Sequence, residues 1–144
     1  MSYERFKDVC KIIENWRPKN YRSEPRYQAD LIKYLRSELN KENLLLTRKD
    51  HIVEKGTGPS KVDIDIDKEI GVELKYNLAS KPKSEIRKLR DQVRDHLKYY
   101  EYVFVVLCGK THMHQEKEIK SGLEDKIRSG VLFSSEKVKI FSKY

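Results

Sequence analysis

Three carboxylates and one ammonium group occupy alternate positions in two short apolar segments, 62–66 and 70–75. Side chains alternate between the two faces of a β-strand, so a hairpin of these segments would bury the apolar residues on one face and gather the charged groups on the other. The charged residues are Asp63, Asp65, Glu73 and Lys75, and the apolar ones are Val62, Ile64, Ile66, Ile70, Val72 and Leu74. Carboxylate oxygens bind divalent cations, so the pattern indicates a candidate metal site.

The length of the hairpin loop decides which two acids face each other. A loop over 67–69 places Asp63 opposite Glu73, whereas a loop over 67–71 keeps the same apolar face but places Asp65 opposite Glu73. We prefer the shorter loop because it fits the common hairpin lengths. Opposed side chains start about 4.5 to 5.5 Å apart, so two carboxylates at these positions repel each other unless a cation lies between them.

A hairpin whose charged face is simply solvated is the alternative interpretation. Against it, aspartate is a poor strand former, and two aspartates facing a glutamate would not be favoured by stability alone. Lys75 could also neutralise Asp63 or Glu73 through a cross-strand ion pair without any metal. The spacing by itself therefore leaves a functional and a structural interpretation open.

The composition suits one domain with a polyanionic partner. The chain has 144 residues, of which 31 are basic and 23 acidic, and a net charge of +8. This length is typical of a single domain, 1–144, with an ordinary hydrophobic core. The positive charge favours contacts with nucleic-acid phosphates. A charged fraction of 38% with only three glutamines is also typical of heat-adapted proteins, which gives the charge a second explanation.

The two cysteines and the hydropathy pattern bear on the cellular compartment. Cys10 and Cys108 lie in apolar periodic segments without redox or zinc spacing, so we expect reduced core residues of an intracellular protein. The chain has no apolar run of about 18 residues and no secretory apolar region near residue 1. We expect a cytoplasmic protein with no membrane partner.

Hydrophobic periodicity and turn residues predict an alternation of helices and strands. Helices are expected over 3–16, 23–40, 82–101 and 116–128, and strands over 43–54, 62–66, 70–75, 102–108 and 138–141. The continuous apolar run of 102–108 predicts a strand that is buried on both faces. This order indicates an α/β domain of two or three layers with a mixed sheet.

The hairpin and its flanking elements resemble the PD-(D/E)XK nuclease superfamily over about residues 22–109. Asp63 matches the motif aspartate, and Glu73 and Lys75 match the acid and the lysine of the second half of the motif, while Val62 replaces the motif proline. The resemblance implies a restriction-endonuclease-like core, α-β-β-β-α-β with a mixed central sheet flanked by helices. The first helix and the C-terminal helix and strand would be additions to this core.

The resemblance also implies roles for individual residues. Asp63, Glu73 and Lys75 would be catalytic, with Asp63 and Glu73 as metal ligands. Glu24 resembles an extra acid that many members carry on the helix before the sheet, although an acid there also stabilises a helix N-terminus without binding metal. Gln92 resembles a helical glutamine of some branches, with a solvated helix residue as the alternative. Asp65 would be an accessory acid.

The implied activity is that of a Mg²⁺-dependent endonuclease acting on DNA, with Mn²⁺ as a substitute ion and RNA as an alternative substrate. Small archaeal or viral nucleases and Holliday junction resolvases are the members that the chain resembles, and a homodimer is the assembly that members often use to cut two strands. Candidate phosphate contacts are Arg48, Lys49, Lys61, Lys83 and Arg87. The alternatives are a nuclease-like module that binds nucleic acid or a protein without cleavage, and a basic structural protein with a charged hairpin.

Overall fold

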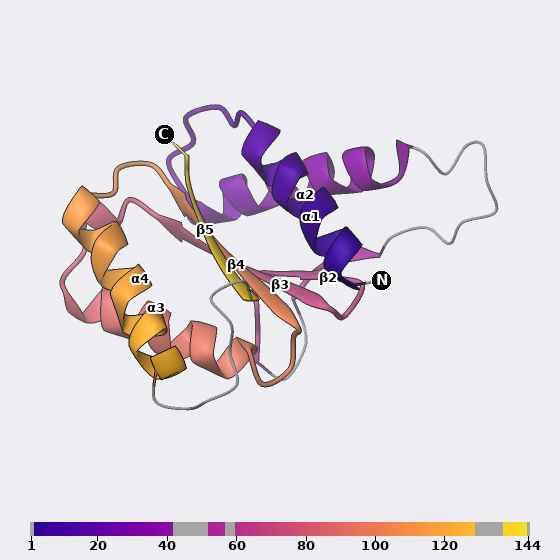
Figure 1. The fold of residues 1–144 in the computed structure, drawn as a ribbon. Coiled ribbons are helices and arrows are strands. Elements are labelled where there is room, and N and C mark those ends of the chain that lie inside the picture. Colours follow the sequence, from indigo (N-terminus) through magenta and orange to yellow (C-terminus); the bar gives the residue numbers. More distant parts are fainter. Residues whose placement is uncertain (1, 42–51, 57–59, 129–136, 144) are drawn as a thin grey trace.

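A mixed β-sheet of five strands forms the centre of the molecule, with helices on both of its faces (Figure 1). The computed structural model describes residues 2–41, 52–56, 60–128 and 137–143. The helices are α1 (Ser2–Asn15), α2 (Glu24–Leu39), α3 (Ser84–His96) and α4 (Met113–Arg128), and the strands are β1 (Val53–Lys55), β2 (Ile64–Ile66), β3 (Ile70–Tyr76), β4 (Tyr102–Cys108) and β5 (Val138–Lys143). The expected α/β class is confirmed.

The strands lie in the order β1-β2-β3-β4-β5. The first three form an antiparallel meander, while β3, β4 and β5 are parallel to one another. Parallel neighbours need a crossover connection, which α3 supplies between β3 and β4 and α4 supplies between β4 and β5. The mixed sheet is therefore a meander joined to two crossover units.

Two hydrophobic clusters on opposite faces of the sheet produce three layers. One joins α1 and α2 to the sheet through residues such as Ile13 and Leu31, and the other joins α3 and α4 to the opposite face through residues such as Leu89 and Ile119. All seven residues of β4 are buried, because this strand lies between the two helical layers. The expectation of a strand buried on both faces is confirmed.

The hairpin has the register expected for the three-residue loop. Ile64 pairs with Val72 and Ile66 pairs with Ile70, so the longer loop with Asp65 opposite Glu73 is wrong. Asp65 instead pairs with Gly71.

The expected position of Val62 on the apolar face of the hairpin is also wrong. Ile64, like the apolar residues of β3, packs beneath α1 and α2, whereas Val62 belongs to the cluster beneath α3 and α4. The strand begins only at Ile64, so the period-two alternation does not extend back to Val62. In its observed position, Val62 packs against Gly71, where a Cβ would lie 2.8 Å from Val62 Cγ1.

Several element ends differ from the expected ones. Helix α3 ends at His96 rather than near 101, and β5 extends to Lys143. Helix α4 begins at Met113, about one turn earlier than expected. The Gln115 side chain explains this start, because its Oε1 accepts a hydrogen bond from the His112 backbone N–H at 2.9 Å and so caps the helix. Of the strand expected over 43–54, residues 43–51 lie outside the described residues, and β1 covers only its end.

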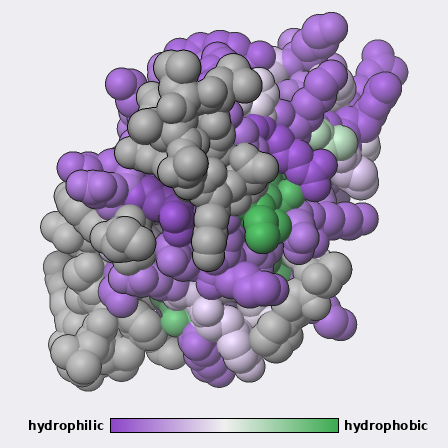
Figure 2. Space-filling view, turned by 90° about the vertical axis from the view of Figure 1, so that its right-hand side faces the viewer, coloured by the Kyte–Doolittle hydropathy of each residue, from purple (hydrophilic) through white to green (hydrophobic). Residues whose placement is uncertain are grey.

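Both cysteines are free, as expected, with Cys108 buried in β4. No helix among the described residues is long and apolar enough to cross a bilayer. Figure 2 shows the side of the molecule that lies at the right of Figure 1, where the described surface is mostly hydrophilic and hydrophobic residues form only small spots.

Candidate active site

The carboxylates of Asp63 and Glu73 meet where the β2–β3 ladder ends, beside Lys75 and the start of α2. Lys75 Nζ lies 3.5 Å from Glu73 Oε2, and Asp63 forms a side-chain hydrogen bond with Glu73. Glu24, in the first turn of α2, interacts electrostatically with both Lys75 and Glu73. Glu24 and Lys75 also line a hollow of about 290 Å³. Four of the residues that the resemblance selects are therefore brought together.

Asp63 is held in place by its backbone as well as its side chain. Its carbonyl oxygen accepts hydrogen bonds from Gln28 Nε2 of α2 and from the Gly56 backbone N–H, each at 3.0 Å. Its carboxylate oxygen Oδ2 accepts a hydrogen bond of 2.7 Å from the Leu74 backbone N–H. Asp63 thus ties together α2, the end of β1 and β3.

The Leu74 backbone faces the acids because β2 provides no ladder partner beyond Val72. In an antiparallel strand the N–H and C=O of one residue point to the same side. Since the Leu74 N–H donates to Asp63, the Leu74 carbonyl lies on the side of Asp63 as well. The site therefore offers a backbone oxygen in addition to its carboxylates.

The pKa of Asp63 is raised from 3.8 to about 7. Burial is the largest cause, followed by the negative charge of Glu73, and Glu24 adds to the same effect. The hydrogen bond from the Leu74 N–H opposes this shift. Without a cation, Asp63 thus retains a proton near neutral pH, because burial and the nearby charge of Glu73 disfavour its ionised form.

Glu24 has a raised pKa for similar reasons. Burial is the main cause and Glu73 contributes, while Lys75, Lys81 and a hydrogen bond from the Tyr76 backbone act in the opposite direction. A carboxylate that only stabilised a helix N-terminus would lie in solvent and gain from the helix dipole. Glu24 is instead half-buried and interacts with Glu73.

His96 is a site residue that the sequence reasoning missed. Its Nε2 lies 2.7 Å from Glu73 Oε1, and His96 is 1% exposed while Glu73 is 3% exposed. His96 Nδ1 is buried and has no hydrogen-bond partner in the part of the chain that the structure describes. An available signal was its spacing, because His96 continues the apolar stripe of Leu89 and Val93 on α3.

Gln28 was missed as well, although it lies four residues after Glu24 and hence on the same side of α2. Gln92 lies one helical turn before His96 on α3. It is half-buried, and its Oε1 atom is buried without a hydrogen-bond partner among the described residues, so it is not a fully solvated helix residue. A water or a ligand group could satisfy this oxygen.

Asp65 lies apart from these acids and is engaged within the fold. Its Oδ2 accepts a hydrogen bond from the Tyr100 hydroxyl at 2.5 Å, and its Oδ1 accepts one from the Lys68 backbone N–H at 3.0 Å. This carboxylate closes the hairpin turn and attaches it to the segment after α3. The geometry favours a structural role for Asp65 over an accessory role in the site.

The expected phosphate contacts are described only in part. Lys61, Lys83 and Arg87 are exposed, as a phosphate contact requires, and Arg48 and Lys49 lie outside the described residues. Lys61 lies two residues before Asp63, and Lys83 precedes the first turn of α3.

The donor set has the chemistry of a hard-cation site, since it combines carboxylates with a backbone carbonyl. Among the residues that the structure describes, no three His, Cys, Asp or Glu side chains are spaced as a formed metal centre. The Lys75 ammonium instead places a positive charge beside Glu73. Comparisons with protein-family models, with curated proteins and with solved structures give no match to this chain.

Proposed function

We propose that this protein is a Mg²⁺-dependent nuclease that hydrolyses phosphodiester bonds in DNA, and that it acts as an endonuclease. The observation that carries the proposal is the contact between Asp63 and Glu73 beside Lys75. A half-buried carboxylate in contact with a buried one reduces stability unless a bound ion compensates the two charges, and such arrangements are enriched at functional sites.

The fold around the site supports the same proposal. The order α2, β1, β2, β3, α3, β4 has the sequence α-β-β-β-α-β, and its strands form an antiparallel meander followed by a parallel crossover. This is the order expected for a restriction-endonuclease-like core. Helix α1 covers the α2 side of the sheet, and α4 with β5 extends the opposite layer and the sheet edge.

Asp63, Glu73 and the Leu74 carbonyl are the groups that would hold Mg²⁺, with Glu24 as a further ligand. A bound Mg²⁺ ion would supply Lewis-acid activation of the phosphodiester and of a water molecule. The Lys75 ammonium would stabilise the negative charge that develops on the phosphate, once it is released from Glu73. His96 would hold Glu73 in a fixed orientation, and Gln28 would do the same for the Asp63 backbone.

DNA is the proposed substrate because the net charge of +8 and the exposed Lys61, Lys83 and Arg87 favour a polyanion. The test is incubation with linear, nicked and four-way DNA and with RNA, each with Mg²⁺, with Mn²⁺ and with EDTA. We expect metal-dependent cleavage of DNA that Asp63→Ala and Lys75→Ala abolish. Asp91→Asn, an exposed substitution on α3, is the matched control and should retain activity. Cleavage that persists in Asp63→Ala would show that the site is wrongly assigned.

A binding module without cleavage is the second candidate. The Lys75–Glu73 ion pair favours it, because a lysine that neutralises the acids removes the need for a metal. That candidate predicts DNA binding that is independent of Mg²⁺ and no cleavage of any substrate.

A further inference from the structure

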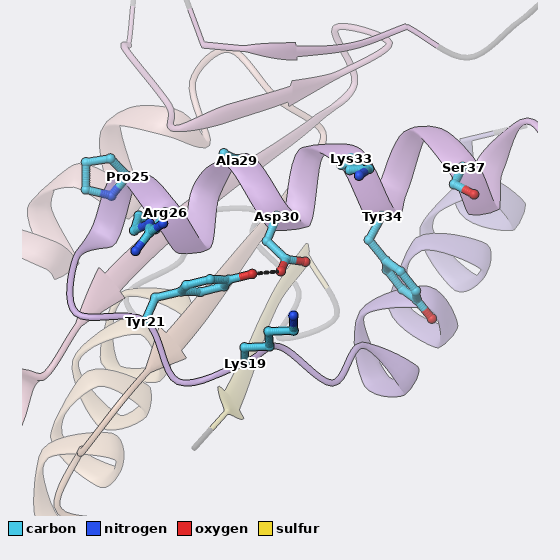
Figure 3. Close-up of a pocket in the computed structure, with 9 residues that line it drawn as sticks. All are labelled: Lys19, Tyr21, Pro25, Arg26, Ala29, Asp30, Lys33, Tyr34 and Ser37. Atoms are coloured by element: carbon cyan, nitrogen blue, oxygen red, sulfur yellow. Dashed lines mark hydrogen bonds between the residues drawn. The ribbon is translucent and has the colours of Figure 1, made fainter.

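A groove of about 750 Å³ runs along the outer side of α2, away from the acidic cluster. Figure 3 shows its walls: α2 forms one side, and the segment that joins α1 to α2 forms the other. Tyr21 lies toward one end and Tyr34 toward the other, with the Lys19 side chain between them. We name this feature the α2 groove, and its polar and aromatic lining consists mainly of Lys19, Tyr21, Arg26, Asp30, Lys33 and Tyr34.

The groove carries an excess of positive charge. Lys19, Arg26 and Lys33 are exposed, and Asp30 is the acid that lines the groove with them. Both Asp30 oxygens are already engaged: Oδ1 accepts a hydrogen bond from Trp16 Nε1 at 3.0 Å, and Oδ2 accepts one from the Tyr21 hydroxyl. Asp30 therefore stabilises the wall of the groove through these two hydrogen bonds, and the cations remain available to an anionic ligand.

The spacing of the cations suits a chain of phosphates. Arg26 and Lys33 are seven residues apart on α2, which corresponds to about 10 Å along the helix axis. This is the rise of about three nucleotide steps in a nucleic-acid strand, at about 3.4 Å per step. The buried face of α2, with Tyr27 and Leu31, lies on the other side of the helix, so these cations are not needed for packing.

The tyrosines add aromatic surface between the cations. Tyr21 is fixed by its hydrogen bond to Asp30 and by edge contact with Tyr27, and the Arg26 guanidinium carbon lies 5.6 Å from the centre of its ring. Tyr34 is half-buried and reaches from α2 into the groove (Figure 3). Aromatic rings beside cations are the combination that binds unpaired bases together with their backbone. An acidic peptide would use the cations but not the exposed parts of the rings.

At the N-terminal end of α2 the groove lies one residue from a member of the acidic cluster. Pro25 lines the groove, and its neighbour Glu24 belongs to the cluster with Glu73 and Lys75. The N-terminal end of α2 therefore separates the acidic cluster from the groove.

We propose that the α2 groove binds a single strand of nucleic acid. The backbone phosphates contact Lys19, Arg26 and Lys33, and an unpaired base stacks on Tyr34. This extends the nuclease proposal by placing a strand-binding surface next to the cleavage site, but binding itself requires neither metal nor cleavage.

The test is fluorescence anisotropy with a labelled oligothymidylate of about 15 nucleotides in EDTA, so that no cleavage occurs. We expect Lys19→Ala/Lys33→Ala to weaken binding about tenfold and to reduce the slope of log K against log salt by about 1.4, since each lost phosphate contact accounts for about 0.7. The matched control is Lys98→Ala/Lys117→Ala on the opposite helical layer, which should change neither quantity. Tyr34→Ala should weaken binding about fivefold or more and Tyr34→Phe should restore it, with circular dichroism to confirm folding.

Three outcomes would overturn the strand-binding proposal. The first is a lysine double variant that binds with the affinity and salt slope of the unmodified protein. The second is equal or tighter binding of duplex DNA together with no effect of Tyr34→Ala. The third is displacement of the oligonucleotide by a polyglutamate peptide at equal concentration. The two proposals fail in different ways. If the protein is not a nuclease, it will show no cleavage in Mg²⁺, whereas the binding measured in EDTA will still follow the pattern expected here.

Discussion

His96 Nε2 lies 2.7 Å from Glu73 Oε1, and both side chains are almost completely buried. With Glu73 ionised, the imidazole N–H is the donor, so His96 fixes one carboxylate oxygen while Oε2 remains directed toward Lys75. Partners of this kind orient ligands, and their removal typically lowers metal affinity about 10- to 100-fold. His96 is therefore a positioning residue for the candidate site.

Replacement of His96 tests this role. We expect His96→Ala to increase the Mg²⁺ concentration needed for half-maximal cleavage about 10- to 100-fold, with a smaller effect at saturating Mg²⁺. His96→Gln can donate one hydrogen bond and should recover part of the affinity. Cleavage rates measured over a Mg²⁺ titration check this expectation. A uniform loss of rate at all Mg²⁺ concentrations, without rescue by glutamine, would indicate a purely structural residue.

Asp63 gives the protein a characteristic dependence of stability on pH. Its pKa is raised from 3.8 to about 7, so between these values the folded state holds a proton that the unfolded state has lost. The free energy of unfolding in EDTA should therefore fall as pH rises through this window. Asp63→Asn should remove this component and be more stable than the unmodified protein by about 1 to 3 kcal/mol at about pH 8.

Urea denaturation of both proteins from about pH 5 to pH 8 measures the difference, in which other titrating groups cancel. Mg²⁺ should stabilise the unmodified protein more at the upper end of this range, where the ion no longer competes with a proton. Parallel curves for the two proteins in EDTA would contradict the raised pKa of Asp63.

Replacement of Lys75 should lower the cleavage rate without weakening Mg²⁺ binding. Lys75→Met removes the cation beside Glu73, so Mg²⁺ should bind at least as tightly as before. The same change removes stabilisation of charge in the transition state, which typically costs about 10² to 10³ in rate. Calorimetric titration with Mg²⁺ and single-turnover cleavage measure the two effects. Retained cleavage in Lys75→Met would exclude a catalytic role.

Substitutions of Asp65 and Tyr100 should lower the free energy of unfolding and leave the cleavage reaction unchanged. Tyr100→Phe removes the donor to a buried Asp65 oxygen, which should lower the free energy of unfolding by about 1 to 3 kcal/mol. Asp65→Asn should also be destabilising, while the Mg²⁺ dependence of cleavage stays unchanged in both variants. A shifted Mg²⁺ dependence in Asp65→Asn would return Asp65 to the set of candidate ligands.

Much of the fold could be predicted because local pattern and tertiary structure agree. The alternation around Ile64 and Val72 fixes the hairpin register, since a slip by one residue would expose the apolar face. The continuous apolar run of β4 predicts a strand buried on both faces, and in the structure two helical layers cover this strand. Val62 could not be placed, because it lies before the first residue of β2 and packs on the other face of the sheet, which its hydrophobicity does not reveal.

The site was predictable only as far as its residues share one hairpin. Glu73 and Lys75 lie on β3, and Asp63 directly precedes the paired strand β2, so sequence spacing reveals that the three are neighbours. His96 reaches Glu73 from α3, and Gln28 reaches Asp63 from α2, so these contacts depend on how the helices dock on the sheet. The structural role of Asp65 likewise could not be predicted from the hairpin pattern, because it depends on a hydrogen bond from Tyr100, which is distant in the sequence.

Cleavage of supercoiled plasmid DNA by the unmodified protein and by Glu73→Gln, with Mg²⁺ and with EDTA, tests the central claim most directly. Glutamine keeps the size of Glu73 and its hydrogen bond to His96 but removes the charge that would hold the ion. We predict conversion to nicked and linear DNA only by the unmodified protein in Mg²⁺. Equal cleavage by Glu73→Gln, or no cleavage by the unmodified protein with either Mg²⁺ or Mn²⁺, would contradict the proposed nuclease function.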